Sequence, residues 1–125
     1  MVSTSPNPIV YVVDDDHAVR DSLETYLTLK GLNTIAFGSA RDVLEYESFG
    51  PELLIVDINM PEIDGFTLLD ALRQRGQNPP VILITGLGDP EVRARADRAD
   101  VAALFDKPID TPALLDVIKR ILERI

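Results

Sequence analysis

Residues 53–61 have the sequence LLIVDINMP, in which a continuous apolar run ends on an aspartate. An apolar run without alternation is typical of a strand that is buried on both faces of a sheet. Similar runs occur elsewhere, although the third is weaker and the fourth is shorter and partly polar: residues 9–13, 81–84, 102–105 and 34–37. The sequence therefore predicts five short strands.

Segments with helical spacing of apolar residues follow these strands, at residues 19–30, 43–47, 66–72, 92–99 and 114–122. Their ends carry local signals. Ser39 with Asp42 resembles a capping box, Asp89 and Thr111 each stand before a proline, and Gly31 indicates a helix stop. Strand and helix alternate five times, which favours right-handed crossovers and a parallel sheet with helices on both sides. The predicted fold is a doubly wound α/β domain.

The composition limits the kinds of site that the chain can build. With 125 residues, of which 46% are hydrophobic, the chain fits one domain over residues 1–125, and residues 1–8 are expected to form a flexible N-terminal segment. Because the chain has no cysteine and one histidine, a metal ion would need oxygen ligands. A net charge of −9 argues against nucleic-acid binding. No apolar run approaches the roughly 20 residues of a membrane span, so we expect a cytoplasmic protein without membrane contact.

Polar residues stand at the carboxyl ends of the predicted strands. Residues 14–16, all aspartates, follow the first strand, and Asp57 ends the third. Thr85 ends the fourth strand, and Lys107 follows the fifth. A five-stranded sheet of order 2-1-3-4-5 brings the ends of strands one and three together at its switch point, where sites of such sheets form. We therefore expect the acidic residues to gather there, with Thr85 and Lys107 alongside.

Concentrated carboxylates need compensating positive charge. Two of them about 4 Å apart repel by about 4 kcal/mol at an effective dielectric constant near 20, so three cannot all stay ionised unaided. A divalent cation and the Lys107 ammonium would together supply that charge. Mg²⁺ suits such a site, with Mn²⁺ as an alternative, because it is usually held by one or two carboxylates, waters and a phosphate oxygen. An aspartate that faces such an ion is a competent nucleophile for phosphoryl transfer.

Taken singly, these residues also have ordinary interpretations. An acidic triplet is more often a solvated loop, and Asp16 is expected to cap a helix. Thr85 alone is more often a strand-end hydroxyl, Lys107 a surface lysine, and His17 a solvated residue. The basic cluster of Arg93, Arg95 and Arg98 is interpreted as a solvated helix face. Residues 60–61, 64–65 and 78–80 are interpreted as turns.

In combination, the motifs are far more specific. They are the pair Asp14-Asp15, the block at residues 57–61 followed by Asp64-Gly65, Thr85 with the small Gly86, and Lys107-Pro108. At these spacings the chain resembles the receiver domain of two-component response regulators, and residues 12–16 and 84–86 are similar to the FixJ type. The resemblance covers almost the whole chain. It implies the flavodoxin-like fold of the chemotaxis regulators, with a five-stranded sheet of order 2-1-3-4-5 and five flanking helices.

The resemblance implies a metal site and a phosphoacceptor. Asp57 would accept the phosphoryl group. Asp15 and Asp57 would bind Mg²⁺ directly, together with the backbone carbonyl of Asn59. Asp14 would hold a metal-bound water.

The resemblance also implies a switch and partners. Thr85, next to Gly86, would hydrogen-bond the phosphoryl group, and Lys107, which precedes a cis peptide bond in most such domains, would pair with its oxygens. The donor would be a phosphohistidine on a sensor histidine kinase or a phosphotransfer protein. The surface around the last two helices and the last strand would then change toward a C-terminal output domain or a partner protein. The domain would not be an enzyme, although it would assist its own phosphorylation and dephosphorylation.

Three segments depart from the family pattern: Leu104, residues 100–101 and Ile109. Leu104 stands three residues before Lys107, where an aromatic residue usually turns inward as the threonine moves, while Phe105 occupies a position that is normally apolar and buried. Residues 100–101, Asp-Val, replace the usual Gly-Ala at the end of a helix, where Gly adopts a left-handed backbone most easily. Ile109 replaces a common Phe. We interpret the reaction centre as intact and the output route as altered.

Three other functions compete with this interpretation. A phosphatase of the haloacid dehalogenase type also uses an aspartate and Mg²⁺, but residues 57–61 lack its second carboxylate. A flavodoxin-like cofactor binder needs hydrogen-bond donors where residues 14–16 would repel a flavin phosphate. The third is a receiver-shaped binding module whose signal is structural or constitutive. Leu104 favours that module, and the complete set of polar site residues argues against it.

Overall fold

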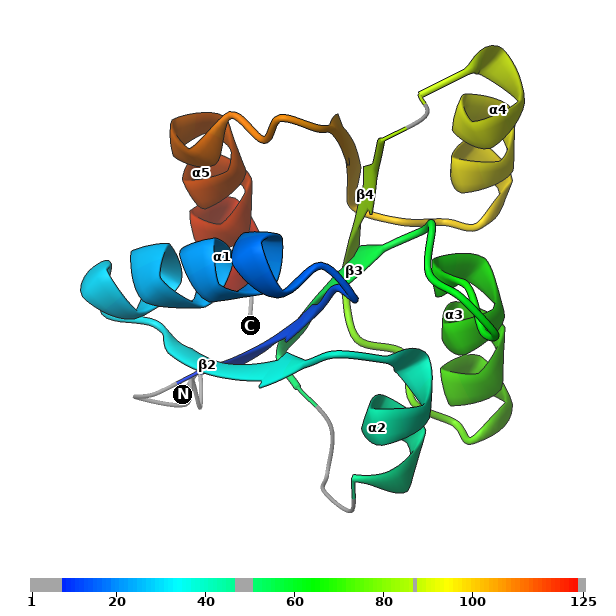
Figure 1. Ribbon diagram of the computed structural model, residues 1–125, viewed down its shortest axis with the longest axis horizontal. Helices are drawn as coiled ribbons and strands as arrows, with labels where there is room; N and C mark the ends of the chain where they lie inside the picture. The colour runs from blue at the N-terminus through cyan, green and yellow to red at the C-terminus, as the bar shows by residue number, and fades with distance from the viewer. Residues whose placement is uncertain (1–7, 47–50, 87, 124–125) are drawn as a thin grey trace.

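The computed structural model describes residues 8–46, 51–86 and 88–123. Within them, strands and helices alternate along the chain (Figure 1). The strands are β1 (Ile9–Val13), β2 (Asn33–Phe37), β3 (Leu53–Asp57), β4 (Val81–Thr85) and β5 (Ala103–Asp106). The helices are α1 (His17–Leu29), α2 (Ala40–Glu45), α3 (Gly65–Gln74), α4 (Pro90–Arg98) and α5 (Thr111–Leu122). The predicted flexible segment, apart from Pro8, lies outside the described residues.

The strands form one parallel sheet of order β2-β1-β3-β4-β5. β3 lies in the middle, where Val56 is opposite Val13 of β1 on one side and Leu83 of β4 on the other. Helices α1 and α5 cover one face of the sheet, and α2, α3 and α4 cover the other (Figure 1). The predicted fold class and strand order are confirmed. Because the strands are parallel, the loops that follow them all leave the same edge of the sheet.

The sheet separates two apolar layers. Leu54 and Val56 of β3 pack in the layer under α2, α3 and α4, while Leu53 and Ile55 pack in the layer under α1 and α5. All residues of β3 are buried, Asp57 included. A strand covered on both faces needs apolar side chains at successive positions, which is why the quoted run shows no alternation.

Most helices begin at an aspartate whose side chain accepts a backbone hydrogen bond. The predicted caps Asp16, Ser39 and Asp89 are confirmed. The cap predicted at Thr111 is wrong, because the Asp110 carboxylate accepts from the Ala113 amide at 3.1 Å and Thr111 is already helical. The earlier start keeps a proline within the first turn of α5, where its missing N–H needs no partner.

The turn predicted at Asp64-Gly65 is also wrong. Asp64 caps α3 by accepting from the Thr67 amide at 2.8 Å, and Gly65 is the first helical residue. A Cβ atom at position 65 would lie 2.9 Å from the backbone oxygen of Asp57. The glycine therefore allows α3 to pack directly against the strand end that carries Asp57.

Helices α1 and α4 are each followed by a residue with a left-handed backbone. Gly31, with φ 88°, follows α1 as predicted. Asp100, with φ 55°, follows α4 and adopts the conformation that is easiest for glycine. Over the three described ranges, no helix combines the length and the apolar character needed to cross a bilayer.

Candidate functional site

Three carboxylates gather at the carboxyl edge of the sheet. One carboxylate oxygen each from Asp14, Asp15 and Asp57 lie within 4.8 Å of one another. Asp14 follows β1 and is 1% exposed, and Asp57 ends β3 and is 3% exposed, whereas Asp15 is exposed. The cluster therefore has two buried members and one that faces solvent.

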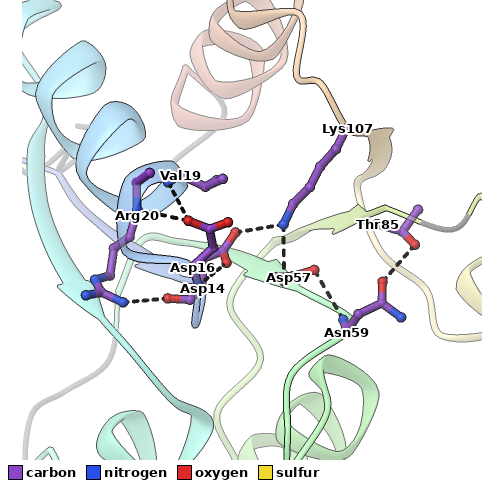
Figure 2. A network of polar contacts seen from close by, with 9 residues as sticks. Asp14, Asp16, Val19, Arg20, Asp57, Asn59, Thr85 and Lys107 are labelled. Atoms are coloured by element: carbon purple, nitrogen blue, oxygen red, sulfur yellow. Dashed lines mark hydrogen bonds and ion pairs between the residues drawn. The ribbon is translucent and has the colours of Figure 1, made fainter.

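Lys107 closes the cluster from the end of β5 (Figure 2). Its Nζ lies 3.3 Å from Asp14 Oδ2 and 3.3 Å from Asp57 Oδ2. Its backbone N–H donates to the Thr85 carbonyl at 2.9 Å, which ties the lysine to the end of β4. Burial alone would lower the pKa of Lys107, but the negative charges of Asp14 and Asp57 outweigh burial, so its pKa is raised. The ammonium is therefore charged at neutral pH.

The electrostatics of Asp57 are unfavourable for its ionised form. Burial and the nearby Asp14 charge raise its pKa above the ordinary 3.8, although the Asn59 amide and Lys107 act in the opposite direction. Three carboxylates and one ammonium leave a formal charge of −2 in the cluster. A divalent cation would neutralise that charge.

Asp14 presents one carboxylate oxygen that no hydrogen bond satisfies. Its Oδ1 accepts from the Asp16 amide at 2.8 Å, while its Oδ2 is the buried side-chain oxygen without a hydrogen-bond partner in the described part of the chain. A buried carboxylate oxygen is costly unless another group satisfies it. This buried oxygen, which faces only the Lys107 ammonium among the described residues, together with the neighbouring carboxylates and the excess negative charge, fits a hard divalent cation or the water it carries.

Asn59 and Thr85 form a second part of the site. The Asn59 amide donates to Asp57 Oδ1 at 3.2 Å. The Thr85 hydroxyl, which is fully buried, donates to the Asn59 side-chain oxygen at 3.1 Å (Figure 2). The sequence assigned only the backbone carbonyl of Asn59 to the site, so the side-chain contact was missed. Asn59 lies in the loop after β3, and its residue type does not indicate that its side chain will meet Thr85 at the end of β4.

Residues 10–119 match the family model of the response regulator receiver domain. The chain belongs to this family. Receiver domains are the signalling modules of two-component response regulators, and they generally bind Mg²⁺ at an acidic pocket. In this receiver domain, Asp14, Asp15 and Asp57 form an acidic cluster.

Known relatives place the receiver domain within longer proteins. It is 38% identical over 116 residues to the C4-dicarboxylate transport transcriptional regulatory protein DctD of Pseudomonas aeruginosa, a match that covers 91% of this chain and 25% of that protein. It is 34% identical over 123 residues to Nodulation protein W of Bradyrhizobium diazoefficiens, a match that covers 96% of this chain and 53% of that protein. The chain thus spans about a quarter to about half of these relatives.

Solved structures of receiver domains have the same fold. The crystal structure of FixJ-N superposes with a TM-score of 0.84 at 31% identity, covering 97% of this chain and 98% of that one. The receiver domain of the Francisella response regulator 1452 superposes with a TM-score of 0.87 at 25% identity, covering 94% and 98%. The predicted resemblance to receiver domains of the FixJ type is confirmed.

The remaining predicted residues lie around the pocket of the receiver domain or away from it. Gly86 is exposed, and a Cβ atom at that position would have no heavy atom within 4 Å, so space is open beside Thr85. The Lys107–Pro108 peptide bond is cis. Leu104 is half-buried in the apolar layer under α4, and Phe105 is half-buried in the layer under α5. Neither side chain enters the site.

Two residues near the pocket carried no functional assignment in the sequence. Arg20 of α1 donates from Nη1 to the backbone oxygen of Asp14 at 2.9 Å. Gly65 makes the close approach of α3 to Asp57. The position of Arg20 could have suggested its contact with Asp14, because a side chain in the first turn of a helix can reach back over the preceding loop.

Proposed function

We propose that this receiver domain accepts a phosphoryl group on Asp57 in a His-to-Asp phosphorelay. The observation that carries the proposal is the setting of the Asp57 carboxylate. It is buried at a strand end, with Oδ1 held by the Asn59 amide and Oδ2 facing the Lys107 ammonium. A carboxylate held in this way is already oriented for attack, and phosphoryl transfer depends mainly on positioning and charge neutralisation.

Mg²⁺ would be held by the carboxylates of Asp15 and Asp57 and the backbone carbonyl of Asn59, with Asp14 binding through a water molecule. When bound, the ion would neutralise charge on the phosphoryl oxygens during transfer. The buried Asp14 Oδ2, which has an ion pair with Lys107 but no hydrogen bond in the described part of the chain, supports this assignment.

The transfer itself would exchange one bond to phosphorus for another. An Asp57 carboxylate oxygen forms a bond to phosphorus while the bond from phosphorus to the donor's histidine nitrogen breaks, and the electron pair stays on that nitrogen. Lys107 would pair with a phosphoryl oxygen in place of one carboxylate. Thr85 would exchange its hydrogen bond with Asn59 for one with another phosphoryl oxygen, in the open space beside Gly86.

The donor would be a sensor histidine kinase or a phosphotransfer protein, and the surface of α4, β5 and α5 would transmit the change. A C-terminal output domain or a separate partner would receive it. The greater length of the relatives supports an output domain elsewhere in the full regulator. The domain would assist its own phosphorylation and dephosphorylation without turning over another substrate.

The test is the intact mass of the protein after incubation with acetyl phosphate, with and without Mg²⁺. We expect one added phosphoryl group that requires Mg²⁺ and that is absent from Asp57→Asn. Asp16→Asn is a matched control, because it removes an equal charge from the same edge while Asn still caps α1.

A binding module that works without phosphorylation is the alternative, and the packing of Leu104 in the apolar layer under α4 favours it. If the chain without substitutions gains no phosphoryl group and shows no detectable Mg²⁺ binding, the phosphoacceptor proposal fails and the binding module remains.

A further inference from the structure

Asp14 is held by the protein at three of its four polar groups. Its backbone N–H donates to the Phe37 carbonyl at 3.1 Å, and its Oδ1 accepts from the Asp16 amide at 2.8 Å. Its backbone oxygen accepts from Arg20 Nη1 at 2.9 Å. Only Oδ2 is left, and it lies 3.3 Å from the Lys107 ammonium. These contacts fix Asp14 after the end of β1 and leave Oδ2 as its one polar atom that faces the acidic cluster without a hydrogen bond among the described residues.

Of these three contacts, only the one from Arg20 of α1 is made by the side chain of another residue (Figure 2). The other two partners are backbone groups of Phe37 and Asp16. The residue is half-buried, and its guanidinium lies beside Gly38, just after β2. A Cβ atom at position 38 would approach Arg20 Nη1 to 3.1 Å and Cζ to 3.6 Å. The absence of a side chain at Gly38 therefore provides the room in which the guanidinium reaches the Asp14 carbonyl.

We propose that Arg20, seated against Gly38, is a positioning residue for divalent-metal binding: it holds the backbone of Asp14 and so fixes the direction of Oδ2. The inference rests on the proposed function, because it concerns the same metal site. Arg20 itself touches neither the ion nor the phosphoryl group.

Charge and positioning predict opposite effects when Arg20 is removed. A cation near an acidic site repels Mg²⁺, so a purely electrostatic role means that loss of the guanidinium tightens metal binding. A positioning role means that loss of the contact loosens the Asp14 backbone and weakens binding. Groups that orient metal ligands typically change metal affinity by about 10–100-fold when they are removed.

The experiment compares Mg²⁺ and Mn²⁺ affinities of the unmodified chain and Arg20→Met. Mg²⁺ is measured by titration calorimetry, and Mn²⁺ by the loss of the free-ion signal in electron paramagnetic resonance. Met keeps the apolar stem of Arg20 and removes both its charge and its donors. We expect about tenfold weaker binding of both ions to the variant.

Three further variants sharpen the comparison. Arg41→Met removes an equal charge from exposed Arg41 of α2, which pairs with Glu62, and should not weaken binding. Arg20→Lys keeps the charge but not the shape of the donor, and should weaken binding. Gly38→Ala should cause a smaller loss by displacing the guanidinium, and no further loss when combined with Arg20→Met. A urea titration shows whether Arg20→Met is folded. If it is not, the metal affinity of Gly38→Ala alone tests the positioning role.

Unchanged or tighter metal binding in folded Arg20→Met would overturn the positioning role while leaving the proposed function intact. The same holds for unchanged binding in Gly38→Ala if that variant has to decide. Absence of Mg²⁺ and Mn²⁺ binding to the unmodified chain would instead overturn the proposed metal site, and this inference with it.

Discussion

The carboxyl edge of the sheet, where Asp14 and Asp57 lie, and helix α4 are stabilised by different contacts. At this edge, every residue of β3 is buried. Asp14, Asp57 and Thr85 lie at the ends of strands that pair on both sides, whereas Lys107 follows the edge strand β5. Helix α4 buries one residue, Ala96, against the body of the protein. Partly buried Val92 also packs against the apolar layer. Polar contacts add to this packing, since Arg93 Nη2 donates to Asp106 Oδ2 at 2.5 Å and the Arg95 guanidinium lies 4.2 Å above the Phe66 ring.

The contrast separates a fully buried part from a part with more exposed contacts. Buried apolar packing and a paired strand keep the pocket atoms in place, as phosphoryl transfer requires. Exposed ion pairs contribute about 0–1 kcal/mol each and are screened by salt, so the polar contacts of α4 add little to its stability. The arginines that the sequence indicated as a solvated face are exposed, but Arg93 and Arg95 are paired.

The largest expected effect comes from truncating the same side chain in the two regions. Leu54→Ala in β3 should lower the free energy of unfolding by about 2–5 kcal/mol, because Leu54 is fully buried. Leu104→Ala, at a half-buried site in the layer under α4, should cost clearly less. Urea unfolding followed by circular dichroism measures both. Equal losses would remove the contrast between the regions.

A smaller and opposite effect is expected at Asp57. Asp57→Asn should raise the free energy of unfolding at pH 7 without Mg²⁺, on the order of 1 kcal/mol. Burial and the Asp14 charge raise the pKa of Asp57 in the folded chain, so its ionised form is less favourable there than in the unfolded chain.

The pH dependence of that gain follows from the sign of the shift. The gain should be full at neutral pH and shrink as the pH falls through the raised pKa. It should vanish below 3.8, where the carboxyl is protonated in both states. Urea titrations between pH 3 and 7 test this, and a destabilised Asp57→Asn at pH 7 would contradict it.

At α4, removal of the ion pair should change local rather than global stability. Arg93→Gln should speed hydrogen exchange of α4 amides by up to about fivefold, the equivalent of about 1 kcal/mol, because the pair is about half exposed. Arg98→Gln is the matched control, since it removes an equal charge from the same helix and no ion pair is found for Arg98 among the described residues.

Salt provides an independent check of the same pair. At about 1 M salt the Debye length falls to about 3 Å, so the unmodified chain should approach the exchange rates of Arg93→Gln. Equal effects of Arg93→Gln and Arg98→Gln would show that charge number, and not the pair with Asp106, controls α4.

The smallest expected effect is the contact between Arg95 and Phe66. A double-mutant cycle with Arg95→Gln and Phe66→Leu should give a coupling energy of about 0.5 kcal/mol, typical of a cation above an aromatic ring at an exposed site. Leu keeps the buried position apolar. A coupling energy of zero would mean that Arg95 does not help to attach α4.

Several features were predictable because they are local in the sequence. Continuous apolar runs indicated the strands, and caps such as Ser39 and Asp89 indicated helix starts. The placement of Asp14, Asp57, Thr85 and Lys107 at one edge followed from strand ends and from the topology of alternating strands and helices.

Other features depend on distant parts of the chain. Thr85 and Asn59 are 26 residues apart, and their hydrogen bond exists because β3 and β4 are neighbours. The cap of α5 was misplaced by one residue, since two adjacent side chains, Asp110 and Thr111, can both accept the same hydrogen bond. The need for a glycine at position 65 could not be inferred from its sequence neighbours. The atoms that a Cβ there would meet belong to Asp57 of β3 and to Ile58.

The sequence by itself determined the fold class and the polar residues at the strand ends, and its resemblance to receiver domains supplied the strand order. Burial on both faces and strand-end position are written in the periodicity of side chains. Only the tertiary structure decided that Asp14 presents a single free oxygen to the cluster, that Arg20 reaches its backbone through the space at Gly38, and that arginine contacts add to the packing of α4. These depend on side-chain directions and on distances of a few ångströms between separate elements, which residue type and spacing do not specify.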